Sequence, residues 1–390
     1  MQKVKIGIVG IGNMGSMHTR FATDSDLLDL VAVCDIDPKA FDRIYAPARK
    51  TVKCFTDLDK FLACPGLELV LISVPHYDHP GIAIKAMNAG KHIIVEKPIA
   101  VHKAAAQKLL DAGKKHPDLV QAAMFCQRPL GAHAKIKQLI DSGELGKITR
   151  INWIITDWFR TQHYYDSGDW RASWRGEGGG VLLNQCPHQL DLMQWFFGMP
   201  NKVRAEVKFG KYHDIEVEDE VNAYLEYPNG AVGNFIASTG EMPGTNRLEI
   251  TAERGRLVYE GGKLEFLRNE RETSEYCRNA TVGFAKAPCW KCEIPYDCNS
   301  TTPVHQIIME NTARAIREGA PLIAPLSEGI RGLELGNAML LSGWRGETVT
   351  LPIDAADFEA RLKKLIATSR YQKPSQRSKS GKTARKSAGK

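Results

Sequence analysis

The sequence predicts an α/β protein with two unlike sheets: a doubly wound parallel sheet first, then a large, mainly antiparallel and open-faced sheet in a second α/β domain. In the first third of the chain, short β-branched runs alternate with amphipathic helical stretches. Strands separated by helices of this length pair in parallel through right-handed crossovers. Between residues 202 and 268, alternating segments are divided by turns such as YPNG and YEGG, which is typical of antiparallel strands.

The expected elements follow in chain order. Strands are expected at residues 4–10, 30–35, 69–75, 92–98 and 120–125, with helical stretches between them. The second part is expected to hold a helix at 132–146, a strand at 148–159, a helix at 178–198, the strands of 202–268 and a long helical region at 303–342. This pattern predicts one domain at 1–127, a second at 128–367 and a basic tail at 368–390.

The positive charge of the chain is concentrated at its C-terminus. The net charge is +7, and residues from Arg370 to Lys390 contribute +8, so residues 1–369 sum to −1. The tail is rich in Ser, Lys and Gly, which predicts a disordered, solvated segment. A weak tether to nucleic acid or to an anionic surface is the alternative, but the tail lacks interleaved aromatics for base stacking.

Two absences bear on location. No apolar run in the sequence is long enough to cross a bilayer. The N-terminus enters a strand and a glycine turn almost at once and has no signal-peptide pattern. We therefore expect a cytoplasmic protein with neither a membrane nor a nucleic-acid partner.

Nine cysteines fall into two groups. Five lie in strand-like or otherwise apolar settings, as free cysteines do in a reduced compartment: Cys34, Cys54, Cys64, Cys126 and Cys186. Four others cluster late in the chain, one pair with CxxC spacing, and permit a structural zinc site: Cys277, Cys289, Cys292 and Cys298. Their remaining spacings fit no standard zinc ribbon or finger, so we expect a loop with incidental thiols and no metal.

A glycine motif directly follows the first strand and opens a helix. GIGNMG, residues 10–15, matches the G-x-G-x-x-G fingerprint of a Rossmann domain in the required context. Gly10 permits the tight turn, Gly12 lets the backbone of the turn approach a pyrophosphate, and Gly15 lets the following helix pack closely on the strand. Asp35 ends the second strand, where a carboxylate binds ribose hydroxyls and repels a 2′-phosphate. The motif therefore predicts NAD, in preference to NADP, held by Gly10, Ile11, Gly12, Asn13, Met14, Gly15 and Asp35.

Two further motifs carry reactive side chains. Lys97 lies in EKP at the end of a predicted strand, and ligands of doubly wound folds bind at that edge of the sheet. In the predicted helix 178–198, Asn184, His188 and Asp191 are spaced i, i+4 and i+7, so one flank presents all three. An imidazole with a pKa near neutrality suits removal of a hydroxyl proton. A lysine can stabilise the developing oxyanion.

In combination, the GxGxxG start, the strand ending EKP and the GGGxLxxxxxHxxD motif resemble the Gfo/Idh/MocA oxidoreductase family over roughly residues 1–365. The resemblance also includes SVPHYDHP before a helix and the closing VTLP. It implies an N-terminal Rossmann domain, a C-terminal α/β domain with an open antiparallel sheet, and NAD(P)-dependent chemistry on sugars, cyclitols and their derivatives. It also implies homodimers or homotetramers.

The resemblance assigns roles to individual residues. Lys97, with a frequently cis peptide to Pro98, and His188 match the catalytic pair, and Asp191 matches a helper or structural acid. Asn184 replaces a frequent aspartate, which favours a Lys–His pair over a Lys–Asp–His relay. Trp170 and Arg171 resemble a pair that approaches the cofactor. The cofactor site is completed by Ser73, Pro75, His79, Glu96 and Lys97, and the catalytic set is Lys97, His188 and Asn184.

The segment 156–170, TDWFRTQHYYDSGDW, is rich in aromatic and polar side chains that suit sugar recognition. Alternatively, it is a surface or oligomer-contact loop. The substrate contacts expected are Lys97, Arg160, Gln162, Tyr164, Tyr165, Asn184 and His188. Two other functions stay open: an NAD-dependent glycosidase that oxidises its substrate transiently, and a non-catalytic dinucleotide-sensing protein.

The sheet of residues 202–268 predicts assembly. One face can pack on the helical region 303–342, but nothing later in the chain can cover the other face. A large, partly apolar face in water is unusual for a monomer. We therefore expect a homo-oligomer that joins these faces around a two-fold axis.

Overall fold

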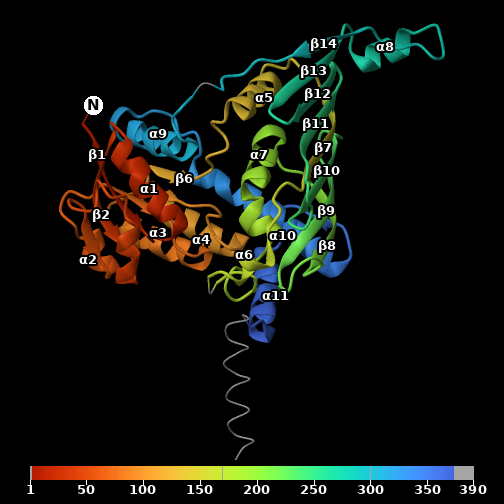
Figure 1. The fold of residues 1–390 in the computed structure, drawn as a ribbon. Helices are drawn as coiled ribbons and strands as arrows, with labels where there is room; N and C mark the ends of the chain where they lie inside the picture. Colours follow the sequence, from red (N-terminus) through yellow and green to blue (C-terminus); the bar gives the residue numbers. More distant parts are fainter. Residues whose placement is uncertain (1, 169, 299, 373–390) are drawn as a thin grey trace, which may run out of the picture.

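The structure is a computed structural model and describes residues 2–168, 170–298 and 300–372. Its N-terminal domain confirms the predicted parallel sheet, with strand order β3-β2-β1-β4-β5-β6 (Figure 1). The strands are β1 (Val4–Val9), β2 (Leu28–Cys34), β3 (Lys53–Phe55), β4 (Leu69–Ile72), β5 (His92–Val95) and β6 (Gln121–Ala123). The helices are α1 (Asn13–Asp24), α2 (Leu58–Leu62), α3 (His79–Asn88) and α4 (Lys103–Gly113), with 3-10 turns η1 (Pro38–Arg43) and η2 (His76–Asp78).

The central strands of this sheet are almost wholly apolar because helices cover both faces. All four residues of β4 and the last three of β5 are buried. The edge strand β3 was not predicted: it has three residues, none of them fully buried. So short and exposed a segment lacks the apolar pattern by which a strand is recognised.

The second domain is built on a nine-stranded sheet of order β14-β13-β12-β11-β7-β10-β9-β8-β15. Its strands are β7 (Ile148–Ile155), β8 (Lys202–Phe209), β9 (Glu218–Glu226), β10 (Val232–Ser238), β11 (Asn246–Ala252), β12 (Gly255–Glu260), β13 (Lys263–Asn269), β14 (Cys289–Glu293) and β15 (Val349–Thr350). All named pairings are antiparallel except that of β7 with β10. This confirms the mainly antiparallel sheet.

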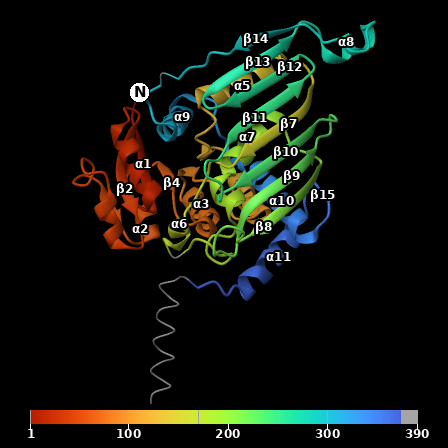
Figure 2. The same ribbon diagram turned by 45° about the vertical axis from the view of Figure 1, so that its right-hand side comes forward.

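Helices lie on one side of the large sheet (Figure 2). They are α5 (Gly131–Asp141), α6 (Gln162–Asp166), α7 (Pro187–Phe197), α10 (Gly329–Arg345) and α11 (Ala355–Thr368), whereas α8 (Thr273–Asn279) projects beyond the β13–β14 end of the sheet. Helix α10 packs on β8 and α7, and inward side chains such as Trp153 and Phe235 are fully buried. In both views, no helix formed by the described residues lies on the opposite face of the sheet.

The helical region expected at 303–342 divides into two helices that serve different domains. Helix α9 (Val304–Glu318) ends at Gly319 in a left-handed conformation, and α10 begins only after the 3-10 turn η4 (Leu326–Glu328). Prolines 321 and 325 interrupt the segment between them. Helix α9 lies against α1, β1 and β5, so it covers the Rossmann sheet (Figure 1).

The prediction of a single helix at 178–198 is also wrong. Residues Val181–Gln185 (η3) form a π-helical turn, and α7 begins at Pro187. A proline has no N–H and its ring collides with the carbonyl four residues back, so a helix restarts at it more readily than it passes through. A Cβ on Gly180 would collide with the Glu218 carbonyl of β9, which explains the last glycine of the GGG motif.

The cysteines and the tail follow the predictions in part. Four of the five apolar-context cysteines are buried, but Cys54 is exposed because β3 is an edge strand. Within the described ranges, no three His, Cys, Asp or Glu side chains gather to hold a metal ion. Residues 373–390 of the tail lie outside the described part. The start of the tail is tied down, since the N–H groups of Arg370 and Tyr371 donate to the Glu216 carboxylate at 2.9 and 2.8 Å.

Among the described residues, every helix is too short or too polar to cross a bilayer.

Candidate active site

The glycine turn between β1 and α1 has the shape of a diphosphate cradle. Gly10 has φ +88°, and a Cβ there would collide with the Ser73 carbonyl. A Cβ on Gly15 would collide with the Gly10 carbonyl, whereas Gly12 faces open space. Helix α1 starts at Asn13 without a side-chain cap, so its first N–H groups are free for an anion. The turn therefore fits the diphosphate of NAD.

Asp35, directly after β2, has a second task besides the predicted ribose contact. Its carboxylate accepts the Ile11 N–H at 2.6 Å and the Asp37 N–H at 2.9 Å. The side chain is half-buried, so it holds the glycine turn in place while keeping a negative charge at the crevice.

We expect Asp35→Ala to weaken NADH binding and to narrow the preference for NADH over NADPH, because the repulsion of a 2′-phosphate is lost. Titration of both nucleotides by fluorescence measures the two dissociation constants. The matched control is Asp37→Ala, which removes the next, exposed acid of the same turn. An unchanged ratio of the constants in Asp35→Ala would show that Asp35 does not read the ribose.

Lys97 follows β5 and is held from the second domain. Its ammonium donates to the main-chain carbonyl of Asn184 at 2.9 Å, and the Lys97–Pro98 peptide is cis, as expected. Burial lowers the pKa of Lys97, while the nearby Glu96 carboxylate opposes that shift. The ammonium is thus placed at the edge of the sheet by both domains.

Glu96, predicted to contact the cofactor, is buried behind Lys97. One carboxylate oxygen lies 2.7 Å from His18 Nε2, and the other accepts the Lys97 N–H at 3.0 Å. Burial raises the pKa of Glu96, but the bond to His18 and nearby positive charges outweigh it and bring the pKa to about 2. The ionised Glu96 therefore orients the loop that carries Lys97.

His188, in the first turn of α7, is 9% exposed. Its Nε2 lies 3.9 Å from Cys126 Sγ, and its Nδ1 has no hydrogen-bond partner in the described part of the chain. Burial and then the charge of Lys97 lower the pKa of His188 to about 3. The imidazole is neutral and has one unused ring nitrogen, so it can accept a proton, although its pKa is well below the expected neutral value.

Asn184, His188 and Asp191 do not share one flank, because the π turn rotates Asn184 away from α7. The Asn184 amide donates to Glu177 at 2.5 Å and to the Tyr164 hydroxyl at 3.3 Å, and no bond joins it to His188. Asp191 faces the other way and forms a bidentate pair with Arg128 at 2.7 and 2.8 Å. Asp191 is therefore structural.

The aromatic segment gathers around the Tyr164 hydroxyl, which accepts from three side chains. Arg171 donates at 2.6 Å, Gln185 at 3.2 Å and Asn184 at 3.3 Å. The Arg171 guanidinium also lies over the Tyr164 ring at 4.3 Å, and the Arg160 guanidinium lies over the same ring at 5.1 Å. Of the predicted substrate contacts in this segment, Tyr164 and Arg160 lie against each other, and that they meet a substrate stays a prediction.

The other two predicted contacts of this segment hold its shape instead. Tyr165 is fully buried, and its hydroxyl lies 2.9 Å from Thr239 Oγ1. The Gln162 amide donates to the Asp166 carboxylate and to the Asp214 carbonyl, and it accepts the Asp214 N–H. In this structure neither side chain is free to meet a substrate, because both fix the short helix α6.

The remaining predicted cofactor residues surround the same edge. Trp170 lies edge-on to His76 at 5.0 Å, and its ring also stacks under the Arg171 guanidinium at 4.4 Å. His79 is buried, and its two ring nitrogens lie 2.7 and 2.8 Å from the carbonyls of Pro98 and Val74. Through its contact with the Pro98 carbonyl, His79 helps to position the Lys97–Pro98 loop. Ser73 and Pro75 lie in the short segment that joins β4 to η2.

Sequence reasoning missed five residues of this region: His76, Cys126, Arg128, Glu177 and His305. His76 stood inside the noted SVPHYDHP motif, and Glu177 directly precedes the GGG motif. Cys126 follows β6, so the rule that strand ends carry site residues could have found it. His305 had no signal in the sequence, because only the return of α9 to the first domain brings it near.

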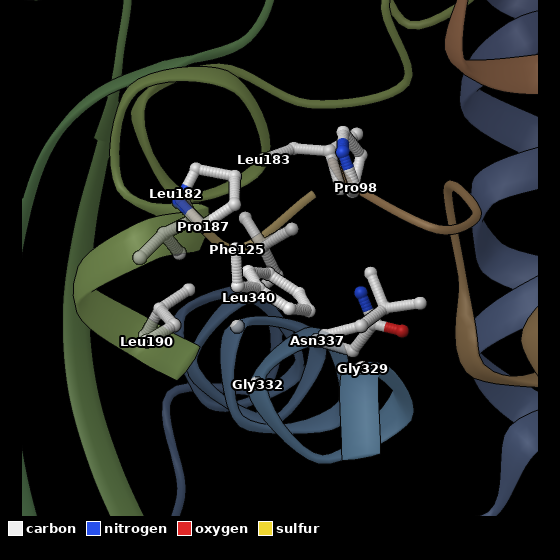
Figure 3. A pocket seen from close by; sticks show the side chains of 12 residues that line it. Pro98, Phe125, Leu182, Leu183, Pro187, Leu190, Gly329, Gly332, Asn337 and Leu340 are labelled. Atoms are coloured by element: carbon white, nitrogen blue, oxygen red, sulfur yellow. The ribbon is translucent and has the colours of Figure 1, made fainter. Parts of the chain in front are cut away.

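Pro98, the residue after Lys97, belongs to an apolar cluster between the two domains that encloses a cavity of about 20 Å³ (Figure 3). Pro98, Phe125 and the α7 residues Pro187 and Leu190 face Gly329, Gly332 and Leu340 of α10. The lining is almost wholly apolar and holds no reactive side chain. The cluster packs the EKP loop against α7 and α10 and so holds the segments that carry Lys97 and His188 next to each other.

The comparisons with known proteins agree with this architecture. Residues 4–124 match the model described as "Oxidoreductase family, NAD-binding Rossmann fold", and residues 133–258 match the "GFO/IDH/MocA C-terminal domain". The chain belongs to the Gfo/Idh/MocA oxidoreductase family, and its N-terminal domain is an NAD-binding Rossmann domain.

Individual relatives are similar over different lengths. The inositol 2-dehydrogenase of Salmonella typhimurium is 32% identical over 37% of this chain and 43% of its own. The levoglucosan dehydrogenase of Pseudarthrobacter phenanthrenivorans is 26% identical over 66% of this chain and 74% of its own. The WlbA dehydrogenase of Bordetella pertussis, solved with NADH and UDP-GlcNAcA, is 25% identical with a TM-score of 0.75, over 90% of this chain and 100% of that one. The chain spans about half the length of the first curated relatives it matches.

Proposed function

We propose that the protein is an NAD-dependent oxidoreductase that transfers a hydride between the nicotinamide and a secondary alcohol or ketone of a sugar, glycoside or cyclitol. One observation carries the proposal. Lys97 and His188 come from different domains, yet the Lys97 ammonium is bonded to the turn that leads into α7, where His188 stands. A cation and a neutral base at one edge are what oxidation of an alcohol requires.

Lys97, His188 and Tyr164 have separate roles in the proposed reaction. Lys97 draws the substrate hydroxyl toward its ammonium and stabilises the oxygen as negative charge develops on it. His188 takes the hydroxyl proton on an imidazole that burial keeps neutral. Tyr164, supported by Arg171, Asn184 and Gln185, offers its hydroxyl to a second substrate oxygen. Bound NAD supplies the hydride acceptor.

The relatives support the substrate class. Their names include an inositol 2-dehydrogenase and a levoglucosan dehydrogenase, and one structure holds UDP-GlcNAcA. All three ligands are cyclic polyols or sugar derivatives. We infer that this protein acts in carbohydrate metabolism. We propose a cytoplasmic location, since Cys34, Cys64, Cys126 and Cys186 are buried free thiols, as in proteins of a reduced compartment.

A screen of cyclitols, aldoses, anhydrosugars, uronic acids and glycosides with NAD tests the proposal. We expect NADH to accumulate with at least one of them, together with one ketone or lactone per NADH. Release of an aglycone without net NADH would favour the glycosidase alternative. Binding of NAD with no change in any compound would favour a dinucleotide-sensing protein.

We also propose a homo-oligomer built on the open face of the large sheet. Its outward side chains mix Ile154 and Ile236 with Asn234, Arg247 and Glu249, none of them fully buried. Ion pairs such as Arg247–Glu249 at 3.0 Å make the face more polar than the sequence suggested. Such a mixed surface is typical of an interface between copies that also fold alone.

The double substitution Ile154→Glu and Ile236→Glu is expected to lower the mass in solution to that of one chain. Light scattering at micromolar concentration measures it. The control is Lys108→Glu on the exposed side of α4, which should leave the mass unchanged. A single-chain mass for the unmodified protein, or an unchanged oligomer in the double variant, would refute this assembly.

A further inference from the structure

We propose that Cys126 and His305 fix the tautomer of His188, so that Nδ1 is the ring nitrogen that takes the substrate proton. The proposal rests on the function proposed above and deepens it. It concerns two side chains that position His188 and do not themselves touch the substrate.

Three side chains from three separate elements form a line. The thiol of Cys126, just after β6, lies 3.9 Å from His188 Nε2 of α7 and 3.3 Å from His305 Nε2 of α9. Cys126 is buried, and His305 is half-buried. The sulfur thus stands between two imidazoles and contacts the same nitrogen atom of each.

The protonation states of this line are fixed by its surroundings. Burial raises the pKa of the Cys126 thiol to about 12, so the sulfur keeps its proton. Burial lowers the pKa of both His188 and His305, so each ring carries one proton. On both rings Lys97 lowers the pKa and Glu96 raises it; His305 and His133 also lower the pKa of His188, and His18 lowers that of His305. Cys126, His188 and His305 are then all neutral, and the Cys126 sulfur contacts both rings.

A thiol has one S–H and a neutral imidazole has one N–H, so Cys126 can donate to only one of the two rings, and two arrangements use the S–H in this way. In the first, Cys126 donates to the nearer His305, and His188 Nε2–H points at the sulfur. His188 Nδ1 then keeps its lone pair. In the second, Cys126 donates to His188 and leaves Nδ1 as an N–H group, which cannot accept a proton. The shorter distance to His305 favours the first.

His305 is itself held in place. Its ring stacks on Phe21 of α1 at 5.8 Å with an interplanar angle of 15° and lies 5.7 Å from His18. His18 is bonded to Glu96, which precedes Lys97. The return of α9 to the Rossmann domain therefore connects the supports of both catalytic residues.

The first arrangement completes the proton balance of the reaction. As the alcohol is oxidised, its O–H bond breaks and an N–H bond forms at His188 Nδ1. The carbinol C–H pair leaves as hydride to NAD, and the carbonyl oxygen stays beside the Lys97 ammonium. The imidazolium that results keeps its Nε2–H toward the Cys126 sulfur. The reverse steps return the proton when a ketone is reduced.

Nitrogen NMR of protein labelled with ¹⁵N-histidine, saturated with NAD, tests the tautomer without any substrate. The two-bond ring correlations distinguish an Nε2–H from an Nδ1–H imidazole, and loss of one pattern in His188→Asn identifies His188. We expect the Nε2–H form. An Nδ1–H form in the unmodified protein would overturn the proposal.

Variants test the role of the two supports. Cys126→Ala and His305→Ala should each mix the tautomers of His188, while Cys126→Ser, which keeps a donor and an acceptor, should restore much of the Nε2–H form. The control is Cys64→Ala, which removes another buried thiol of the Rossmann domain. A pure Nε2–H pattern in both alanine variants would contradict the proposal.

Turnover separates this inference from the proposed function. With a substrate in hand, each alanine variant should lower kcat about tenfold with little change in KM, and the double variant should lose no more than the worse single one, because the two residues act through one ring. If the losses in kcat of the two single variants instead added up in the double variant, the two residues would not act through the same ring. The expected NMR pattern in a protein that turns over no substrate would instead refute the function and leave the tautomer assignment standing.

Discussion

Replacing Lys97 or His188 with alanine is expected to lower kcat by about 100-fold or more while NAD still binds. Lys97 stabilises the reacting oxygen and His188 accepts its proton, whereas the diphosphate cradle is formed by the glycine turn of β1 and α1. Steady-state kinetics on the substrate found in the screen and NADH titration measure the two quantities separately.

The matched control for Lys97 is Lys91→Ala. Lys91 is also half-buried and donates to a main-chain carbonyl, that of Leu67, at 2.9 Å, but it lies at the start of β5, away from the crevice. Its loss should leave kcat near normal. Near-normal turnover in both Lys97→Ala and His188→Ala would remove the catalytic assignment.

The second large effect concerns stability. Arg128 and Asp191 are each 1% exposed and form a bidentate pair, and Arg128 also donates to the Ile323 carbonyl and to Glu328. Burial raises the pKa of the Asp191 carboxyl, and the two bonds from Arg128 oppose that shift. Asp191→Ala should therefore cost about 3–5 kcal/mol, because it leaves a buried guanidinium without its main partner.

Urea unfolding followed by fluorescence measures this loss. The double variant Arg128→Met with Asp191→Leu should be less damaging than Asp191→Ala, since no charge remains buried. The surface pair Arg345–Asp357, with side chains 31% and 36% exposed, provides the control. Asp357→Ala should cost no more than about 1 kcal/mol. A similarly small loss in Asp191→Ala would show that the buried pair is not a support of the fold.

Much of the fold could be predicted because its signals are local. Buried strands such as Leu69–Ile72 and the glycine turn at Gly10 carry their pattern within a few residues. The errors arose where tertiary contacts decide. Helix α9 covers the first domain although it follows the second in sequence, and Pro187 divides a helix whose periodicity alone is continuous.

The site could be predicted as far as single motifs reach. Lys97, His188 and the glycine turn could be proposed as site residues because strand ends and spacing mark them. The partners of Asn184 could not be predicted, since Glu177 and Tyr164 reach it only through the π turn. Likewise, the low pKa of His188 follows from its burial beside Lys97, which no spacing reveals.

If Lys97 and His188 act as proposed, the protein oxidises a carbinol carbon directly, at the edge of the sheet where these two side chains meet. The most direct test uses a substrate from the screen that carries deuterium on that carbon, with NAD and the unmodified protein, and analyses the product and the reduced cofactor by mass spectrometry. The deuterium should appear in NADH in a one-to-one ratio with ketone or lactone. Cleavage of the substrate with its deuterium exchanged for solvent hydrogen and no net NADH would contradict direct oxidation.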